Sequence, residues 1–186
     1  VAHGGTIERE GSAPLSDLAD SVAKAQRVVL LLAASDVTLL RVQVPPLSPA
    51  RLKAALPNLV EDQLMSDPAE CIVVAGGASN GLRTIAVVNR GWLEILAKTI
   101  GTFGARHIAA LPAQLCLPYQ SGIVSAAVTG QDANIDVTMR LSEHNGIGLP
   151  LMPEQAETAA RDAVRAICAL MPEAPIALYV PGADVK

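Results

Sequence analysis

Residues 76–84, Gly-Gly-Ala-Ser-Asn-Gly-Leu-Arg-Thr, are the stretch of this chain that comes nearest to a phosphate-binding loop. A true loop of this kind carries Lys directly after its last Gly and leads into a helix. Here Leu82 follows Gly81, and a strand-like apolar run follows where a helix is required. Asn80-Gly81 is instead typical of a tight hairpin turn. The stretch therefore predicts a hairpin, and no cofactor is expected there.

Other residue types that could do chemistry are isolated in the sequence. Asp36 follows Ser35 between two strand-like runs, where a metal or sugar ligand is one interpretation and a turn in which Asp bonds its own backbone is the favoured one. His3, His107 and His144 have no Ser or Cys at a diagnostic spacing. Structural or solvent-facing roles are favoured for them, although a triad assembled in space stays open. The sequence thus predicts no catalytic and no metal-ligating residues.

The cysteines carry no sign of a disulfide framework or a metal site. There are three of them, Cys71, Cys116 and Cys168, and they lie far apart. An odd and sparse set fits a reducing compartment. We expect each cysteine to be a small, buried, apolar residue.

One charged cluster could serve a partner. Four acidic residues fall within ten positions: Glu61, Asp62, Asp67 and Glu70. No Lys or Arg lies between Glu61 and Arg83. Such a run is usually a solvated helix end, but it could also meet a basic partner surface and speed the encounter. These four residues are the candidate partner-binding residues.

The composition excludes several classes of protein. The chain has 186 residues and a formal net charge of −4, and its 14 Lys and Arg residues form no run. Aromatic residues make up 2% of the chain. Binding to nucleic acid is therefore not expected, because it needs clustered cations and, for single strands, stacking side chains. The longest uncharged run, Ile108–Gln131, is interrupted by Pro and Gly and does not read as a membrane span.

The elements that would position these residues are clearest between Val28 and Glu70. Val28–Ala34 is a continuous apolar run of strand length, which suits a strand covered on both faces. Val37–Val44 alternates like a strand with one covered face. Ser48-Pro49 is a strong helix start, and Pro57 should kink or restart that helix.

The rest of the chain predicts an α/β protein of two lobes, with residues 1–115 in the first and residues 116–186 in a second, incomplete one. The second lobe has the strand-strand-strand-helix-strand order that opens a ribonuclease-H-like core. Val1–Glu10 has two interpretations that are about equally favoured, two short strands around a turn at Gly4-Gly5 or a frayed terminus. In the rest of the first lobe we expect a helix over Pro14–Gln26 capped by Ser16, a hairpin of Cys71–Ala75 with Leu82–Val88, a helix over Gly91–Phe103 with Ile95 and Ile100 on its buried side, and a strand at Arg106–Ala110.

In the second lobe we expect strands at Ser121–Thr129, Asn134–Arg140 and Ile147–Leu149, with a turn at Asn145-Gly146. They are followed by a helix over Pro153–Met171, buried through Ala156, Ala160, Ala163, Val164 and Ile167, and by a strand at Ile176–Val180.

The stretch that begins at Val28 also resembles a known family. The matching residues are Val28–Leu32, Ala34–Val37, Val42–Pro45, Arg51–Pro57 and Val60–Leu64. They are similar to the cytoplasmic region of the type II secretion system protein L family, and the match is good over roughly Val28–Ala75. One position departs, because the family often has Pro where this chain has Ala33.

The resemblance implies an actin-like α/β fold built from ribonuclease-H-like lobes, with mixed sheets and flanking helices. It implies no enzymatic activity, because the family generally lacks the nucleotide-binding elements of actin-like ATPases. It implies a scaffold of the inner-membrane platform of Gram-negative bacteria, which recruits the N-terminal domain of the secretion ATPase, protein E, for protein export across the outer membrane. An actin-like nucleotide binder of the pilus-assembly type is the alternative.

The resemblance also implies a location and further partners. A single membrane-spanning helix, which pairs with protein M of the same system, would lie after Lys186. The present stretch would then be a soluble region at the cytoplasmic face of the inner membrane. A homodimer is a further candidate assembly.

Overall fold

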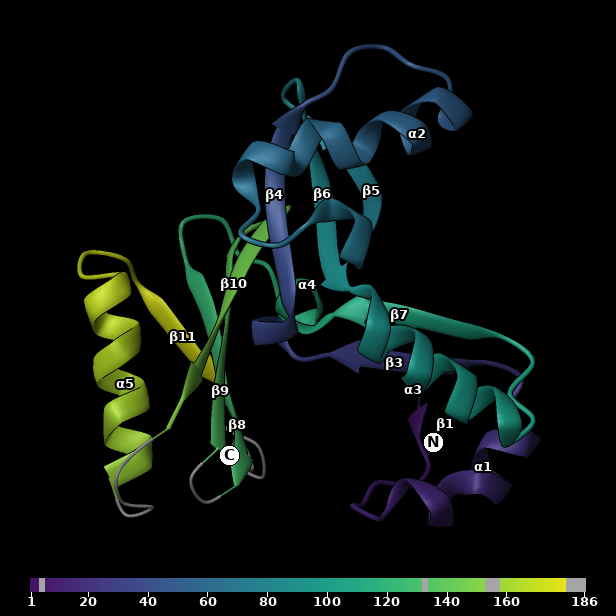
Figure 1. The fold of residues 1–186 in the computed structure, drawn as a ribbon. Helices are drawn as coiled ribbons and strands as arrows, with labels where there is room; N and C mark the ends of the chain where they lie inside the picture. Colours follow the sequence, from purple (N-terminus) through teal and green to yellow (C-terminus); the bar gives the residue numbers. More distant parts are fainter. Residues whose placement is uncertain (4–5, 132–133, 153–157, 180–186) are drawn as a thin grey trace. The chain divides into compact units, whose positions relative to one another are not determined.

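The computed structural model describes residues 1–3, 6–131, 134–152 and 158–179 (Figure 1). The chain divides into two compact units. The first unit joins Val1–Leu30 with Gly91–Ala110, and the second joins Leu31–Arg90 with Leu111–Lys186. These limits do not coincide with the lobe boundary expected after residue 115, which stays a prediction.

The first unit holds the amino-terminal strands and α3. Its elements are β1 (Ala2–His3), β2 (Thr6–Ile7), the 3₁₀ turn η1 (Leu15–Leu18), α1 (Ala19–Lys24), most of β3 (Val28–Leu32), α3 (Arg90–Thr102) and most of β7 (Ile108–Pro112). β1 and β2 pair antiparallel, which agrees with the strand interpretation and not with a frayed terminus. The predicted cap is wrong, because Ser16 lies inside η1 and its hydroxyl donates to the Asp17 carboxylate at 3.0 Å.

Two burial predictions for the first part of the chain are also wrong. Within the described part of the chain, β3 pairs with β7 alone, in a sheet of two strands, and Val29 and Leu31 remain 46% and 64% exposed. An apolar strand is covered on both faces only where other elements supply the cover. In α3, Ile100 is buried but Ile95 is exposed, because five residues turn a helix by about 140°.

The second unit contains two sheets. Its elements are η2 (Ala34–Asp36), β4 (Val37–Gln43), α2 (Pro49–Val60), η3 (Glu61–Gln63), η4 (Pro68–Glu70), β5 (Cys71–Ser79), β6 (Leu82–Asn89), α4 (Ala113–Cys116), β8 (Val124–Gln131), β9 (Asn134–Ser142), β10 (Asn145–Leu151), α5 (Ala159–Leu170) and β11 (Ile176–Tyr179). The three-stranded sheet has the order β4-β6-β5, and the four-stranded sheet has the order β10-β9-β8-β11.

The hairpin of β5 and β6 is tighter than expected. Its turn consists of Asn80 and Gly81 alone, with φ values of 53° and 74°, which is the left-handed backbone that a two-residue hairpin turn needs. The Gly76–Ser79 stretch extends β5 instead of forming a loop, with a bulge between Ala75 and Ala78. The hairpin prediction is confirmed.

α2 covers the three-stranded sheet and starts where the sequence predicted. Ser48 occupies the cap position, although its side chain makes no capping hydrogen bond. Pro57 lies inside the helix, which continues to Val60 and does not restart. Leu56 and Val60 are buried against Ile85 of β6, so burial of this face offsets the backbone hydrogen bond that proline cannot donate.

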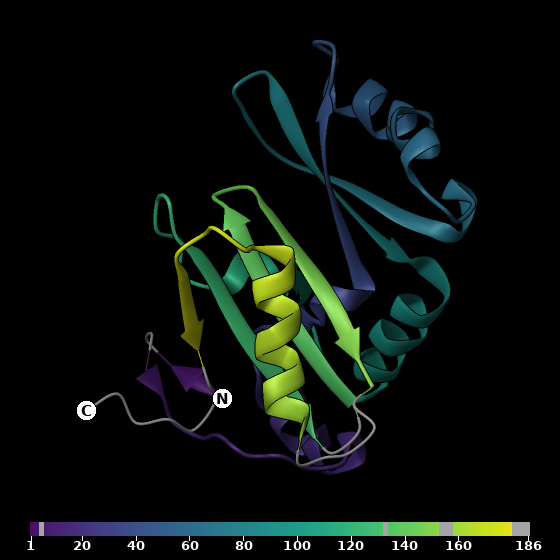
Figure 2. The same ribbon diagram turned by 90° about the vertical axis from the view of Figure 1, so that its left-hand side faces the viewer.

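The four-stranded sheet packs one face against α5 (Figure 2). β8, β9 and β10 are antiparallel neighbours and β11 runs parallel to β8. Along the chain, β8, β9, β10, α5 and β11 follow the predicted order of three strands, a helix and a strand. Val137 and Met139 from β9 are fully buried beneath Ala163 and Ile167 from α5.

Details of this second core differ from the prediction. The β9–β10 turn is formed by Glu143 and His144, while Asn145 already begins β10 at a bulge. α5 buries Ala159, Ala163 and Ile167, whereas Ala160 and Val164 are exposed. The buried set repeats every four residues, so the helix is rotated from the expected face. The first part of the predicted helix, residues 153–157 with Ala156, lies outside the described residues.

The opposite face of the four-stranded sheet packs so closely against η2 and α4 that two positions of β10 have no room for a side chain. A Cβ atom added to Gly148 would overlap the backbone of Ala34 and Ser35, and one added to Gly146 would lie 2.7 Å from Cβ of Gln114. Gln114 is fully buried and its amide donates to the Val37 carbonyl at 2.9 Å. Glycine at these positions of β10 therefore permits the contact.

Candidate functional site

The four predicted partner-binding residues lie in one segment, Glu61–Glu70, which we call the acidic segment. It joins α2 to β5 through the short turns η3 and η4. Glu61, Asp62, Asp67 and Glu70 are all exposed, as a solvated or partner-facing cluster requires. The structure therefore leaves all four carboxylates accessible on one short connection.

Asp67 has a local structural role as well. Its carboxylate accepts a hydrogen bond from the backbone N–H of Ala69 at 2.8 Å, at the start of η4. This is the usual role of Asp at a helix start. Asp67 thus helps to shape the acidic segment, whereas Glu61, Asp62 and Glu70 make no side-chain hydrogen bond or ion pair within the described residues.

Met65 is a feature of the acidic segment that the sequence reasoning missed. Its side chain is fully exposed, while its neighbour Leu64 packs onto the core below α2. A fully exposed Met is a flexible apolar group that a partner can bury. The only signal in the sequence was a large apolar residue between Leu64 and the polar run Ser66-Asp67.

Arg90 fixes the far end of the acidic segment. Its guanidinium donates to the carbonyl of Ala69 at 3.4 Å and to that of Cys71 at 2.8 Å. A charged donor on backbone carbonyls is among the stronger hydrogen bonds in a protein. The acidic segment is therefore held at both ends, by Leu64 in the core and by Arg90 on the backbone.

The other candidate residues do not come together as a catalytic site. No group of three or more His, Cys, Asp or Glu residues that could hold a metal ion occurs among the described residues. Asp36 is exposed in η2, where its backbone N–H donates to the Ala33 carbonyl at 3.0 Å. His107 is exposed, and the side chain of His3 lies outside what the structure describes.

The cysteine prediction is correct only for Cys71, which is buried; Cys116 and Cys168 are exposed. Cys116 closes the single turn of α4, and its thiol donates to the Pro112 carbonyl at 3.5 Å. Partial burial raises the pKa of the Cys116 thiol, and the nearby Arg140 only partly counters this. A raised pKa disfavours the nucleophilic thiolate.

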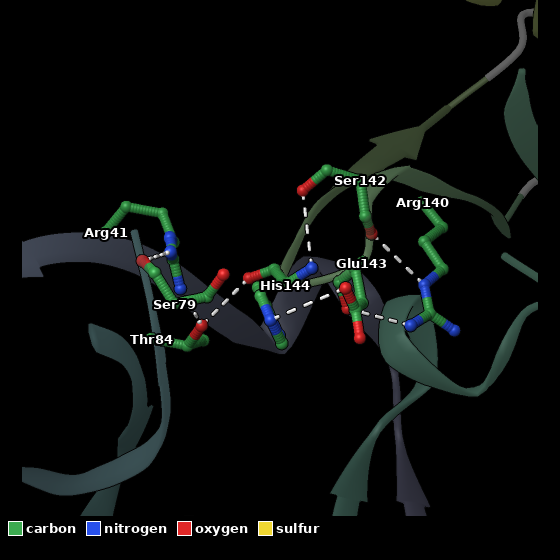
Figure 3. A network of polar contacts seen from close by, with 7 residues as sticks. All are labelled: Arg41, Ser79, Thr84, Arg140, Ser142, Glu143 and His144. Atoms are coloured by element: carbon green, nitrogen blue, oxygen red, sulfur yellow. Dashed lines mark hydrogen bonds and ion pairs between the residues drawn. The ribbon is translucent and has the colours of Figure 1, made fainter. Parts of the chain in front are cut away.

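His144 belongs to a polar network that ties the two sheets of the second unit together (Figure 3). Arg41 of β4 donates to the Thr84 hydroxyl and to the Ser79 carbonyl, both at 2.8 Å. The Thr84 hydroxyl donates onward to the His144 carbonyl at 3.1 Å. The His144 imidazole lies 3.8 Å from the Glu143 carboxylate. These contacts place His144 in a structural connection.

Arg140 supplies the second half of this network. Its guanidinium donates to four backbone carbonyls, those of Leu115, Leu117, Ser142 and Glu143, at 2.6–3.2 Å. Its charge also lies 5.5 Å from the ring centroid of Tyr119, a cation–π distance. Arg140 therefore fastens α4 and the following loop to the β9–β10 turn.

No helix among the described residues is long and apolar enough to cross a membrane.

Comparison with known proteins assigns the family. A family model for type II secretion system (T2SS) protein L matches residues 3–170. The type II secretion system protein L of Vibrio cholerae serotype O1 (strain ATCC 39315 / El Tor Inaba N16961) is 31% identical over 118 residues. That match covers 61% of this chain and 28% of the relative, so the chain spans well under half of that protein's length.

Among solved structures, the chain is similar to the cytoplasmic domain of EpsL, an inner membrane component of the type II secretion system of Vibrio cholerae. The TM-score is 0.64 at 23% identity, covering 91% of this chain and 68% of that one. The PilM-PilN type IV pilus biogenesis complex gives 0.48 at 13% identity, covering 92% and 56%. A Bacteroides thetaiotaomicron protein with an actin-like ATPase fold gives 0.44 at 10% identity, covering 92% and 68%. The last two add nothing to the assignment.

The likeness to the EpsL domain, together with the sheet order above, confirms the predicted α/β fold of mixed sheets with flanking helices. The resemblance carried by Val28–Leu64 is confirmed as well, and the family model extends it over most of the sequence. This chain belongs to the family of type II secretion system protein L.

Proposed function

We propose that this chain is a non-enzymatic scaffold at the cytoplasmic face of the bacterial inner membrane, where it docks the N-terminal domain of the secretion ATPase, protein E. Membership of the protein L family is the observation that carries the proposal. Protein M of the same system pairs with parts of the protein outside this chain.

The acidic segment is the proposed contact surface. Its four carboxylates are exposed, and Met65 offers an exposed apolar side chain between them. Rim charges speed association with a surface of opposite sign, and a central side chain that becomes buried supplies affinity. The matching partner surface is basic, with an apolar recess for the methionine.

A nucleotide-binding role of the pilus-assembly type is not favoured. The stretch nearest to a phosphate loop, residues 76–84, consists of the end of β5, the two-residue turn Asn80-Gly81 and the start of β6. Its backbone is largely committed to the antiparallel ladder, whereas a phosphate loop presents free N–H groups at a helix start.

The experiment measures binding of the purified ATPase N-terminal domain by calorimetry at low salt, where charge effects are largest. The test variant is Glu61→Lys with Asp62→Lys. We expect it to weaken binding by about tenfold or more, because two favourable charges become repulsive. Met65→Ala should weaken binding and leave its salt dependence unchanged.

The matched control is Glu8→Lys with Glu10→Lys, which reverses the same number of exposed charges elsewhere. It should leave the affinity within about twofold. Unchanged affinity of the Glu61/Asp62 variant would remove the acidic segment from the interface. Failure of the unaltered proteins to associate at tens of micromolar would contradict docking through this chain.

A further inference from the structure

Two arginines and a histidine gather at the amino ends of β3 and β7 in the first unit. Arg27 directly precedes β3, and Arg106 with His107 directly precedes β7. The backbone N–H of Val28 donates to the His107 carbonyl at 2.8 Å. This hydrogen bond holds the two strand starts side by side, so residues 79 positions apart in sequence share one place on the unit.

An open cavity lies at this place. Its volume is about 890 Å³, and it is lined by Gln26, Arg27, Arg106, His107, Ile108 and Ala109. This volume falls within the range of small-molecule sites, about 300–1,000 Å³. The depression is therefore wide enough for a ligand that carries its charged group on a larger body.

The two guanidinium groups at the cavity have no partner among the residues that the structure describes. Within the described residues, the side chains of Arg27, Arg106 and His107 make no hydrogen bond and no ion pair. Arg41, Arg90 and Arg140, by contrast, are each engaged by backbone carbonyls. The chain has a net charge of −4. Two guanidinium groups without partners at one cavity therefore give this place a local excess of positive charge that attracts an anion.

We propose that this cavity binds the phosphate group of a larger molecule. Each guanidinium can give a planar pair of N–H donors to phosphate oxygens, and the Gln26 amide adds another donor. A phosphate has more oxygens than a carboxylate, so two guanidinium groups can bind it at once. The phosphate can belong to a soluble ligand or to an anionic lipid headgroup, and the recognition chemistry is the same. The site shares no residue with the acidic segment and does not depend on ATPase docking.

The experiment uses the ¹⁵N-labelled 186-residue chain and three probes. Inorganic pyrophosphate and adenosine diphosphate, both without metal, are titrated while backbone amide shifts are recorded. Vesicles of phosphatidylcholine with and without phosphatidylglycerol are tested by co-sedimentation. We expect the largest shifts at residues 26–28 and 106–109. Binding to the soluble probes alone identifies a soluble ligand. Binding to phosphatidylglycerol vesicles alone, lost in the variant below, identifies a headgroup.

The test variant is Arg27→Gln with Arg106→Gln. Both side chains are exposed, so the fold should persist and circular dichroism checks it. We expect at least about a tenfold loss of affinity, since two charge-assisted pairs disappear. Arg27→Lys with Arg106→Lys keeps the positive charges but removes the paired N–H donors of the guanidinium groups. Its affinity should therefore lie between those of the unaltered chain and the glutamine variant.

The control is Arg9→Gln with Lys98→Gln, two exposed cations of the same chain that do not line the cavity. Its affinity should stay within about twofold of the unaltered chain. An equal loss in the control would show that only net charge matters and would overturn the proposal. The absence of binding in all three arms, or shifts centred away from the two strand starts, would overturn it as well.

Discussion

The β3–β7 pair and the four-stranded sheet β10-β9-β8-β11 differ both in the composition of their strands and in the elements that cover them. Leu31 in β3 is 64% exposed, whereas Met139 in β9 is fully buried beneath α5. The run Val28–Leu32 is uniformly apolar, and β9 mixes apolar residues with Asp136, Thr138 and Arg140. The more apolar strand is thus the less buried one. Burial follows from what packs on a strand rather than from its own hydrophobicity.

The largest effect that tests this comparison is the removal of a core side chain. Met139→Ala should lower the free energy of unfolding by about 3 kcal/mol, because it leaves a cavity under α5. Leu31→Ala should change it by less than about 0.5 kcal/mol. Urea denaturation followed by circular dichroism measures both. Equal losses of unfolding free energy in the two variants would mean that β3 is covered in solution. The two strands would then not differ in burial.

A second test addresses the opposite face of the four-stranded sheet. Gly148→Ala should cost about 2 kcal/mol, because its new Cβ overlaps the backbone of η2 and that backbone must move. Gly77→Ala, in the bulge of β5, has open space around the new Cβ and should cost less than about 0.5 kcal/mol. Urea denaturation followed by circular dichroism measures the free energy of unfolding of both glycine variants. If Gly148→Ala left the free energy of unfolding unchanged, the sheet would be covered on one face only, by α5.

The smallest expected effect concerns arginines in the two regions. Arg140→Gln should cost about 1.5 kcal/mol, because four carbonyls lose a charged donor. Arg106→Gln, at the start of β7, should be neutral within about 0.5 kcal/mol, since its side chain has no partner among the described residues. Thermal melts compare them. A similar drop in melting temperature for both would remove the distinction between the two arginines.

The sequence predicted those features whose causes are local. Asn80-Gly81 specifies its own turn because both residues tolerate positive φ. Ser48-Pro49 begins α2 because proline suits the first helical turn. The exposure of Glu61, Asp62, Asp67 and Glu70 was likewise predictable, because unpaired carboxylates stay in water.

Features that depend on distant partners were not predictable from one sequence. The face of α5 that is buried, with Ala159 and without Val164, depends on where the strands beneath it lie. The hold of Arg90 on the acidic segment joins residues about twenty positions apart. The cationic cavity depends on the pairing of β3 with β7. Local patterns carry no information on such pairings.

The packing of β10 against η2 has a consequence for the order of folding. Gly148 meets Ala34, Gln114 donates to the Val37 carbonyl 77 residues away, and Thr84 donates to the His144 carbonyl 60 residues away. During synthesis, β4, β5 and β6 emerge from the ribosome before any of these later groups exist. Contacts of such long sequence separation form slowly. The three-stranded sheet β4-β6-β5 is therefore synthesised before β10 and α4 can pack against it. During this interval the nascent chain is most exposed to misassociation.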